Sequence, residues 1–319
     1  MSRRPGLSAF LLASTLWCLP VLAHAAEPLA FELTIESNQK DITPWMSQHL
    51  ALQRYKSLTD LDDQEMTQLL RDADVQAREL LATQGYFNPQ LQWKLDPTPT
   101  AAHLRSVKLD IDVGPAARIT EVQIAWQGDI ATRPEAAAQR EQVLSDWALP
   151  SGQDFSQSQW SQAKAQALRQ VQAERYPHAQ IADSQADVDA QNNQVRLSLT
   201  IDSGPPVTIG PVRITGTERY SAEQAERLAH LKTGAVYKQN DLLMAQQRLV
   251  ASGFYDAVFV SLDPEGPVDA TPVKVELRET LRQKWVMGLG VRSDSGPRLT
   301  AEYTQNRLPV LDWRGVTKL

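Results

Sequence analysis

The chain has 319 residues, with 32 Lys and Arg against 38 Asp and Glu, and a formal net charge of −6 at pH 7. This acidic balance makes nucleic acids and anionic membrane surfaces poor candidates as partners, because both repel negative charge. The single cysteine, Cys18, excludes an internal disulfide framework. At roughly 150 residues per domain the length predicts two domains, but the repeats described below favour three smaller ones.

The N-terminus has the features of a secretory signal peptide. Arg3 and Arg4 give it a positive start, and residues 7–22 are largely apolar. A small-x-small site follows, which predicts cleavage between Ala25 and Ala26. The chain is therefore expected to be exported.

The alternative to a signal peptide is an uncleaved membrane anchor. The apolar stretch is short for a membrane span of ~20 residues, and it contains Pro20, so that cleavage is favoured. Cleavage would also remove Cys18. The exported chain would then have no thiol and would depend on packed cores for its stability.

Three stretches of the chain share one order of signals: strand, short helix, turn, longer helix, strand, strand. They are residues 27–115, 116–205 and 206–279, called modules 1, 2 and 3 below. An aromatic residue follows each longer helix, and in two of the three modules a glycine precedes it. Glycine accepts the left-handed conformation that often ends a helix. The three pairs are Gly85-Tyr86, Arg175-Tyr176 and Gly253-Phe254.

Modules 2 and 3 share a second motif, Leu-x-x-Gly-x-x-aromatic, between their helices. It contains Gly152 and Phe155 in module 2, and Gly234 and Tyr237 in module 3. The glycine stands where the chain turns from the shorter helix to the longer one. Module 1 lacks this motif.

Modules 1 and 2 each end with Gly-Pro, at residues 114–115 and 204–205. This dipeptide cannot continue a strand ladder and marks a turn. The interval between the two is too long for a solenoid repeat and is typical of a string of small domains.

The helices and strands are amphipathic. Apolar residues recur every three or four positions in the longer helices, which gives each helix one apolar face. The strands alternate apolar and polar residues, the pattern of a sheet with one buried and one solvent-facing side. Each module is therefore expected to be an α+β layer of two helices on a small sheet. In module 3 the buried helix face is expected to hold Leu242, Ala245, Leu249 and Val250, and capping boxes are expected at Ser156 with Gln159 and at Ser221 with Gln224.

Residues 280–319 follow a different pattern. One side of the first predicted strand has large apolar residues at Trp285, Met287 and Leu289, whereas glycines alternate with them on the other side. In a water-soluble protein this would be an ordinary hairpin, but in a transmembrane β-barrel the apolar side would face lipid. The signal peptide and the repeated modules favour the barrel. Two strands and the start of a third cannot close a barrel of at least ~8 strands, so we expect an incomplete barrel, in a fragment or a truncated product.

The order strand–helix–helix–strand–strand, the Gly-aromatic motif at Gly253 and the Leu-x-x-Gly-x-x-aromatic motif ending at Tyr237 resemble POTRA (polypeptide-transport-associated) domains. Three such domains with an export signal and a barrel start resemble the TamA-like family of outer-membrane assembly factors. The resemblance implies a β-barrel of about 16 strands in the outer membrane of a Gram-negative bacterium. It also implies that the POTRA domains lie in the periplasm.

The same resemblance implies that the protein helps to insert or secrete autotransporters and other outer-membrane barrel proteins. It further implies a TamB-like partner that is anchored in the inner membrane. Two alternatives are a two-partner-secretion type transporter, which normally has two modules and a plug helix, and a general barrel-assembly insertase, which normally has five modules.

No residues have the spacing of a catalytic or metal site. The sequence has neither a Gly-x-Ser-x-Gly elbow nor a phosphate-binding loop, and its one cysteine lies in the predicted signal peptide. We therefore expect a protein that is not an enzyme and that binds no metal or cofactor. No pair of its histidines has ligand spacing; they are His24, His49, His103, His178 and His230.

Function is instead expected at the edges of the sheets. The second strand of each module, at residues 90–95, 180–188 and 258–262, is predicted to be an edge strand. An unpaired edge can bind an extended client segment by strand addition, through main-chain hydrogen bonds of ~0.5–1.5 kcal/mol each. In module 3 the candidate client-binding residues are Val258, Phe259, Val260, Ser261 and Leu262.

Two other interpretations of these edges remain open. Charged residues such as Asp183, Asp187 and Asp263 could protect the edges against any strand addition. The edge of module 3 could also pack on the periplasmic rim of the barrel.

Overall fold

The computed structural model describes the chain except for residues 1–28, 282, 293–295, 306–314 and 319. The predicted cleavage site at Ala25 and Ala26 lies outside the described residues. The described chain forms two compact units. One comprises the described residues up to Ala77 together with Gln90–Asp112, and the other comprises Arg78–Pro89 together with the described residues from Val113 onward.

The helices and strands follow the predicted order in modules 1 and 3, and module 2 has one additional short helix directly after its first strand. Module 1 contains β1 (Glu32–Ser37), α1 (Ile42–His49), a 3-10 helix (Ala51–Tyr55), α2 (Asp63–Thr83), β2 (Gln90–Asp96) and β3 (Ser106–Asp112). Module 2 contains β4 (Arg118–Gln127), α3 (Asp129–Thr132), a 3-10 helix (Pro134–Ala136), α4 (Ala137–Ser145), α5 (Gln157–Gln172), β5 (Gln180–Asp189) and β6 (Gln194–Asp202). Module 3 contains β7 (Ile209–Thr215), α6 (Ala222–Ala229), α7 (Gln239–Ala251), β8 (Tyr255–Leu262), a 3-10 helix (Val268–Ala270) and β9 (Thr271–Glu279).

The three sheets have the same topology. Their strand orders are β1-β3-β2, β4-β6-β5 and β7-β9-β8. The central strand is parallel to the first strand of its module and antiparallel to the second. The second strand therefore lies at an edge in every module, as the sequence predicted.

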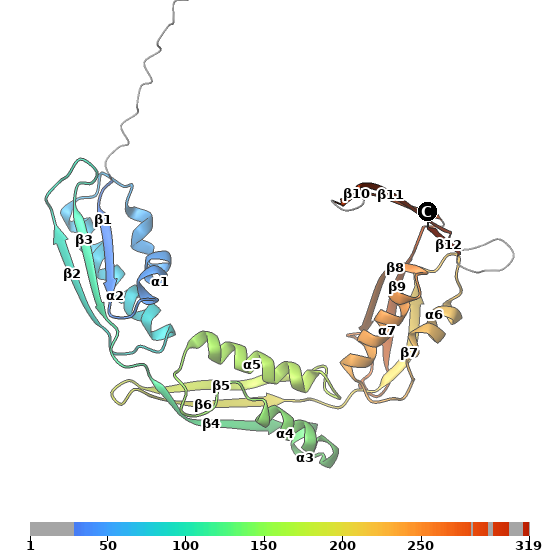
Figure 1. Ribbon diagram of the computed structural model, residues 1–319. Helices are drawn as coiled ribbons and strands as arrows, with labels where there is room; N and C mark the ends of the chain where they lie inside the picture. Colours follow the sequence, from blue (N-terminus) through green and yellow to red (C-terminus); the bar gives the residue numbers. More distant parts are fainter. Residues whose placement is uncertain (1–28, 282, 293–295, 306–314, 319) are drawn as a thin grey trace, which may run out of the picture. The chain divides into compact units, whose positions relative to one another are not determined.

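The helices of each module cover one face of its sheet (Figure 1). The central strand β6 alternates buried and less buried positions along its length, because every second side chain points toward the helices. The buried cores of modules 2 and 3 are separate clusters. Their members include Ile119, Trp160, Tyr176 and Leu197 in module 2, and Leu242, Leu249, Tyr255 and Val275 in module 3.

Both predicted helix caps are present. The hydroxyl oxygen of Ser156 accepts a hydrogen bond from the backbone N–H of Gln159 at the start of α5. Ser221 accepts the equivalent bond from Gln224 at the start of α6. Each cap satisfies one of the N–H groups that a helix leaves free at its N-terminus.

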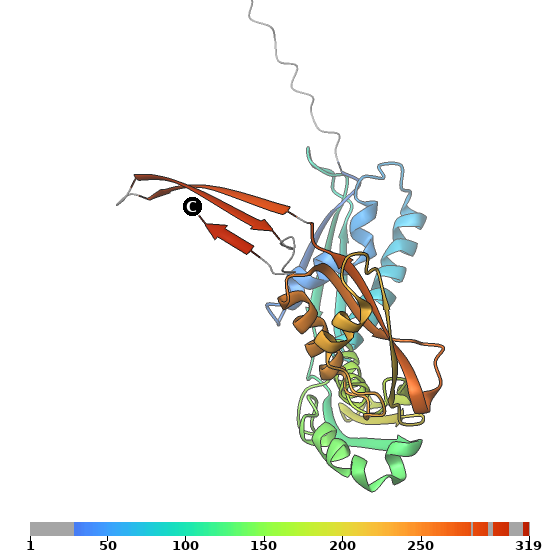
Figure 2. The ribbon, with the colours of Figure 1, turned by 90° about the vertical axis from the view of Figure 1, so that its right-hand side faces the viewer.

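The last three strands, β10 (Gln283–Arg292), β11 (Gly296–Gln305) and β12 (Gly315–Lys318), form an antiparallel sheet of their own, drawn in red in Figure 2. Trp285, Met287 and Leu289 are 63%, 74% and 89% exposed, so these side chains are not part of a module core. Trp285 pairs with Tyr303 across the strands, and the centroids of their rings are 4.4 Å apart. No helix in the described part of the chain is both long and apolar enough to cross a membrane.

Candidate functional site

The five candidate residues from Val258 to Leu262 form most of β8, which pairs with β9 alone in its sheet. Val260 is 9% exposed and belongs to the core of module 3, whereas Phe259 is 59% exposed on the opposite side. Alternate residues of such an edge strand direct their N–H and C=O groups away from the sheet. No residue from Ala257 to Leu262 carries a charged side chain. Asp256, at the start of β8, forms an ion pair with Arg278 at 2.8 Å. The stretch from Ala257 to Leu262 therefore offers an uncharged main-chain edge.

The corresponding edges of modules 1 and 2 carry charges. In β2, Lys94 forms an ion pair with Asp110 at 3.1 Å. In β5, Asp187 forms an ion pair with Arg196 at 2.6 Å. Charged side chains on an edge oppose the addition of another strand. Among the three second strands, β8 has the longest stretch without a charged side chain, from Ala257 to Leu262, and this stretch is the least protected.

Asp263, which could have protected the edge just after β8, does not do so. The residue is 9% exposed and turns inward, with its carboxylate 3.0 Å from Lys274 Nζ and 3.3 Å from Arg213 Nη1. The hydrogen bond from Lys274 lowers the pKa of Asp263 and outweighs the opposing effect of burial. The side chain fixes the loop after β8 and leaves the edge itself uncharged.

Helix α7 packs beside β8 (Figure 1). It has exposed apolar side chains on its outer surface. Leu243 and Val250 are each 49% exposed, and they border a shallow depression of about 300 Å³. Val250 was expected in the core with Leu249, and this expectation is wrong. Adjacent helix positions point in directions about 100° apart, so only one of the two can face the sheet.

The three predicted helix-end residues adopt the left-handed conformation. The φ angle is +90° at Gly85, +66° at Arg175 and +73° at Gly253. The aromatic residues that follow differ in burial: Tyr176 is fully buried, whereas Tyr86 and Phe254 are partly buried. Arg175 thus has a conformation that costs a residue with a side chain roughly 1–2 kcal/mol.

The glycine of the Leu-x-x-Gly-x-x-aromatic motif holds the first strand of its own module. Gly234 has a φ angle of +81°, and its N–H donates to the carbonyl of Ile209 at 2.7 Å. In module 2, Gly152 has a φ angle of +92° and donates to Ile119, also at 2.7 Å. The motif is therefore a turn whose hydrogen bond connects the loop between the two helices to the start of the first strand of the same module.

The aromatic residue of this motif is joined by backbone hydrogen bonds to the residue that ends the longer helix of the preceding module. In the joint between modules 2 and 3, the carbonyl of Arg175 accepts from the N–H of Val207, and the N–H of Arg175 donates to Tyr237. Tyr237 in turn donates its N–H to Val207. Similar bonds occur at the start of module 2, where the N–H of Phe155 donates to the carbonyl of Ala117 and the N–H of Ala117 donates to the carbonyl of Gly85. All three residues belong to the second compact unit.

Tyr176 links the end of α5 to the short helix α3. Its hydroxyl donates to Asp129 Oδ2 at 2.8 Å, and Asp129 also pairs with Arg133. Burial raises the pKa of Tyr176 to about 12, and the hydrogen bond to Asp129 acts in the same direction. The guanidinium of Arg133 lowers the pKa of Asp129. This cluster is structural, and the pattern of residue types does not predict it because Tyr176 is 47 residues from Asp129 in the chain.

Glu279, the last residue of β9, accepts four hydrogen bonds. Three come from the backbone N–H groups of Glu218, Arg219 and Tyr220, and the fourth comes from the Arg219 side chain at 2.7 Å. Burial alone would raise the pKa of Glu279, but these donors outweigh it and hold the pKa at about 2. Arg219 also bonds to the carbonyl of Thr280. The cluster fixes the chain where module 3 ends and the last three strands begin.

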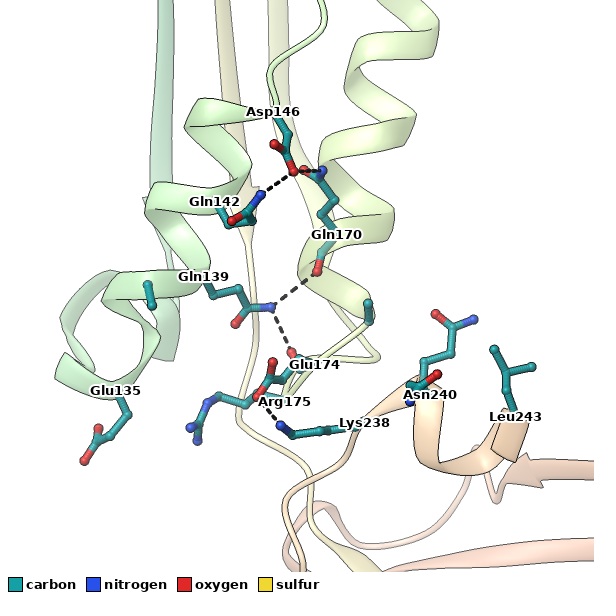
Figure 3. Close-up of a pocket in the computed structure, with 13 residues that line it drawn as sticks. Glu135, Gln139, Gln142, Asp146, Gln170, Glu174, Arg175, Lys238, Asn240 and Leu243 are labelled. Atoms are coloured by element: carbon teal, nitrogen blue, oxygen red, sulfur yellow. Dashed lines mark hydrogen bonds and ion pairs between the residues drawn. The ribbon is translucent and has the colours of Figure 1, made fainter. Parts of the chain in front are cut away.

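An open groove of about 610 Å³ lies between the helices of module 2 and the start of α7 (Figure 3). The side-chain N–H2 of Gln139 crosses it to the carbonyl oxygens at the end of α5 and just beyond. Lys238 Nζ lies 3.3 Å from Glu174 Oε1. Five of the lining residues carry amide side chains: Gln139, Gln142, Gln170, Gln239 and Asn240. The residue pattern of the sequence does not predict this groove.

The described residues contain no group of three or more His, Cys, Asp or Glu side chains that could hold a metal ion. The open groove and the β8 edge also lack a nucleophile paired with a base. What these surfaces can do chemically is to form hydrogen bonds and apolar contacts with another chain.

Comparison with known protein families assigns module 3 to a family. Residues 207–280 match the family model for POTRA, described as a surface antigen variable number repeat. This stretch is a POTRA domain. It contains both the β8 edge and α7. Modules 1 and 2 share the strand order and pairing of the POTRA domain.

Several solved structures resemble the chain in part. The crystal structure of BamA POTRA3-5 from Haemophilus influenzae is 18% identical, with a TM-score of 0.45, and the match covers 79% of this chain and 96% of that one. BamA from Haemophilus ducreyi lacking POTRA domains 1-3 is 20% identical, with a TM-score of 0.47, over 63% of this chain and 37% of that one. CdiB from Acinetobacter baumannii is 14% identical, with a TM-score of 0.34, over 81% of this chain and 47% of that one. Likeness at this level adds nothing to what the family match establishes.

Proposed function

We propose that the protein acts in outer-membrane protein assembly or secretion, and that its POTRA domain holds unfolded client polypeptides at the β8 edge. The observation that carries this proposal is an edge strand without charged side chains from Ala257 to Leu262, inside the POTRA domain. A client strand added to β8 would gain ~0.5–1.5 kcal/mol for each main-chain hydrogen bond. A few such bonds bind loosely and with little sequence preference, which suits a factor with many clients.

A finer proposal is that the chain is TamA-like and that β10 to β12 are the first strands of a β-barrel in the outer membrane. Its support is the exposure of Trp285, Met287 and Leu289, because a large apolar side chain left in water forgoes ~1.5–3 kcal/mol that burial would provide. Contact with lipid would recover this free energy. The modules would then lie in the periplasm, where they could meet autotransporters as clients and a TamB-like partner anchored in the inner membrane.

Site-specific photocrosslinking tests the role of β8. A benzophenone amino acid replaces Phe259 or Ser261 in the full chain, in cells that produce an autotransporter. Both positions are expected to crosslink to the unfolded client. The control position is Ala125, which is exposed on the edge strand β4 of module 2.

Charge substitution provides the second arm of the test. Phe259→Lys and Ser261→Lys introduce charge on the edge, and neither residue is in the buried core, so the fold should persist. Both substitutions should reduce client crosslinking from the remaining β8 position, whereas Ala125→Lys should not. Equal crosslinking from β8 and from Ala125, or no effect of the lysines, would contradict the proposal.

A further inference from the structure

The groove between modules 2 and 3 contains a residue whose backbone is suited to glycine. Arg175 has a φ angle of +66°, and the equivalent positions of the other two modules, Gly85 and Gly253, are glycines with similar angles. The conformation of Arg175 is imposed from both sides, because its N–H donates to Tyr237 at 2.9 Å and its carbonyl accepts from Val207 at 2.8 Å. A non-glycine residue held in this way carries strain, and such strain tends to occur at functional sites.

The side chain of Arg175 does not stabilise the joint through direct bonds. Among the described residues its guanidinium has neither a hydrogen bond nor an ion pair, although it lines the groove beside Gln139 and Glu174 (Figure 3). Its charge acts at a distance on Asp129, and that carboxylate is already paired with Arg133. A strained residue with an unengaged guanidinium is therefore available for a ligand.

The amide side chains of the groove also have free hydrogen-bonding capacity. Gln139 uses its N–H2 group for main-chain carbonyls, and its buried Oε1 has no hydrogen-bond partner in the described structure. A buried acceptor without a partner is costly unless a donor reaches it. Gln239 and Asn240, in the first turn of α7, add two amide side chains with no hydrogen bonds to other described residues. An amide offers one donor group and one acceptor, as a peptide bond does.

The charged side chains of the groove limit which ligand charges it can accept. Its lining holds three carboxylates, Glu135, Asp146 and Glu174, against two cations, Arg175 and Lys238. This balance disfavours a phosphate dianion. One carboxylate on an otherwise neutral, amide-rich ligand can still pair with Arg175, since arginine forms two parallel hydrogen bonds to a carboxylate.

We infer that the groove binds an extended polypeptide segment that carries a carboxylate, with Arg175 bound to the carboxylate and the free amides bound to peptide groups. The inference rests on the proposed function in one respect, that the protein meets unfolded polypeptide. The site is separate from β8, so one chain would hold a client at two places. Binding at two linked sites is tighter than at either one when the segment between them can span the distance.

The test uses the full chain in detergent and a short fluorescein-labelled peptide of serine and threonine with one central glutamate and an amidated C-terminus. A second peptide has glutamine in place of the glutamate. Fluorescence anisotropy should show about tenfold tighter binding of the glutamate peptide, the typical effect of a charge-assisted hydrogen bond pair. Arg175→Gly and Arg175→Asn should remove that difference, and Arg175→Lys should retain part of it. Arg175→Glu should reverse the preference in favour of a lysine-containing peptide.

Stability measurements separate binding from a structural role. Arg175→Gly should leave the thermal unfolding midpoint unchanged or higher while peptide discrimination is lost. His230→Gly is the matched control, because His230 also has a positive φ angle, +52°, but does not line the groove. It should relieve strain without changing peptide binding.

Three results would overturn the inference: equal affinity for the two peptides, unchanged discrimination in Arg175→Gly, or displacement of the peptide by millimolar inorganic phosphate. The lysine substitutions in β8 distinguish this failure from failure of the proposed function. Phe259 does not line the groove, so Phe259→Lys should leave the tenfold difference between the short peptides in place while it reduces client crosslinking at β8.

Discussion

Arg219 donates a hydrogen bond to Glu279 across 2.7 Å and joins the loop before α6 to the last residue of β9. The Glu279 side chain is 5% exposed and the Arg219 side chain 23% exposed, so water screens the pair only weakly. The Glu279 carboxylate also accepts hydrogen bonds from three backbone N–H groups. The pair thus closes the POTRA domain at its C-terminal end.

Glu279→Gln is expected to destabilise the POTRA domain by about 3 kcal/mol, because it leaves the Arg219 guanidinium without its counter-charge. Hydrogen exchange of the amides in β7, β8 and β9 in the full chain measures this loss. Glu276→Gln is the control, since Glu276 is an exposed carboxylate in the same strand. Equal exchange rates in the two variants would show that the pair contributes nothing.

The same carboxyl predicts how the stability of the POTRA domain depends on pH. Its pKa of about 2 in the folded chain lies below the ordinary value of 4.5, so the folded state is stabilised wherever the carboxyl is ionised in both states, above about pH 5. This contribution is lost as the pH falls through the folded pKa, and the difference between 4.5 and about 2 corresponds to roughly 3 kcal/mol. Unfolding of the wild type by urea between pH 7 and pH 2 should therefore show a steeper acid loss than unfolding of Glu279→Gln. Parallel curves would contradict the prediction.

Local features of the fold could be predicted from the sequence, because each depends on neighbouring residues. The left-handed helix ends at Gly85 and Gly253 and the cap at Ser156 are of this kind. The edge position of β8 followed from the repeated order of elements, which leaves the second strand of each module with one partner.

Other features depend on residues that are distant in sequence, and the pattern of residue types does not show them. Glu279 meets Arg219 only because β9 ends beside the segment that follows β7. The sequence left open whether Asp263 is a surface charge that protects the edge, whereas Lys274 and Arg213 hold it inward. The groove beside Arg175 could not be predicted either, since it depends on how the joint between modules 2 and 3 closes.

Two buried tyrosines are expected to respond differently to loss of the hydroxyl. Tyr176→Phe removes the hydrogen bond to Asp129 and should cost about 1 kcal/mol. Tyr255→Phe should be neutral or stabilising, because the buried hydroxyl of Tyr255 has no hydrogen-bond partner in the described structure. Thermal unfolding of the two variants gives the comparison. A larger loss in Tyr255→Phe than in Tyr176→Phe would show that the Tyr255 hydroxyl is satisfied by water.

Alanine substitutions at Gly216 and Gly234 should distinguish the cost of backbone strain from the cost of a steric clash. Their φ angles are nearly equal, +82° and +81°, so alanine at either position should cost about 1–2 kcal/mol for the left-handed conformation. At Gly234 an added Cβ would meet no atom within 4 Å, whereas at Gly216 it would lie 1.8 Å from the carbonyl oxygen of Leu277 in the central strand β9. Gly216→Ala must therefore displace β9 and should cost at least ~2 kcal/mol more than Gly234→Ala. Limited proteolysis and thermal unfolding of the two variants measure the difference, and equal losses would mean that the close approach of Gly216 to β9 is not required by the fold.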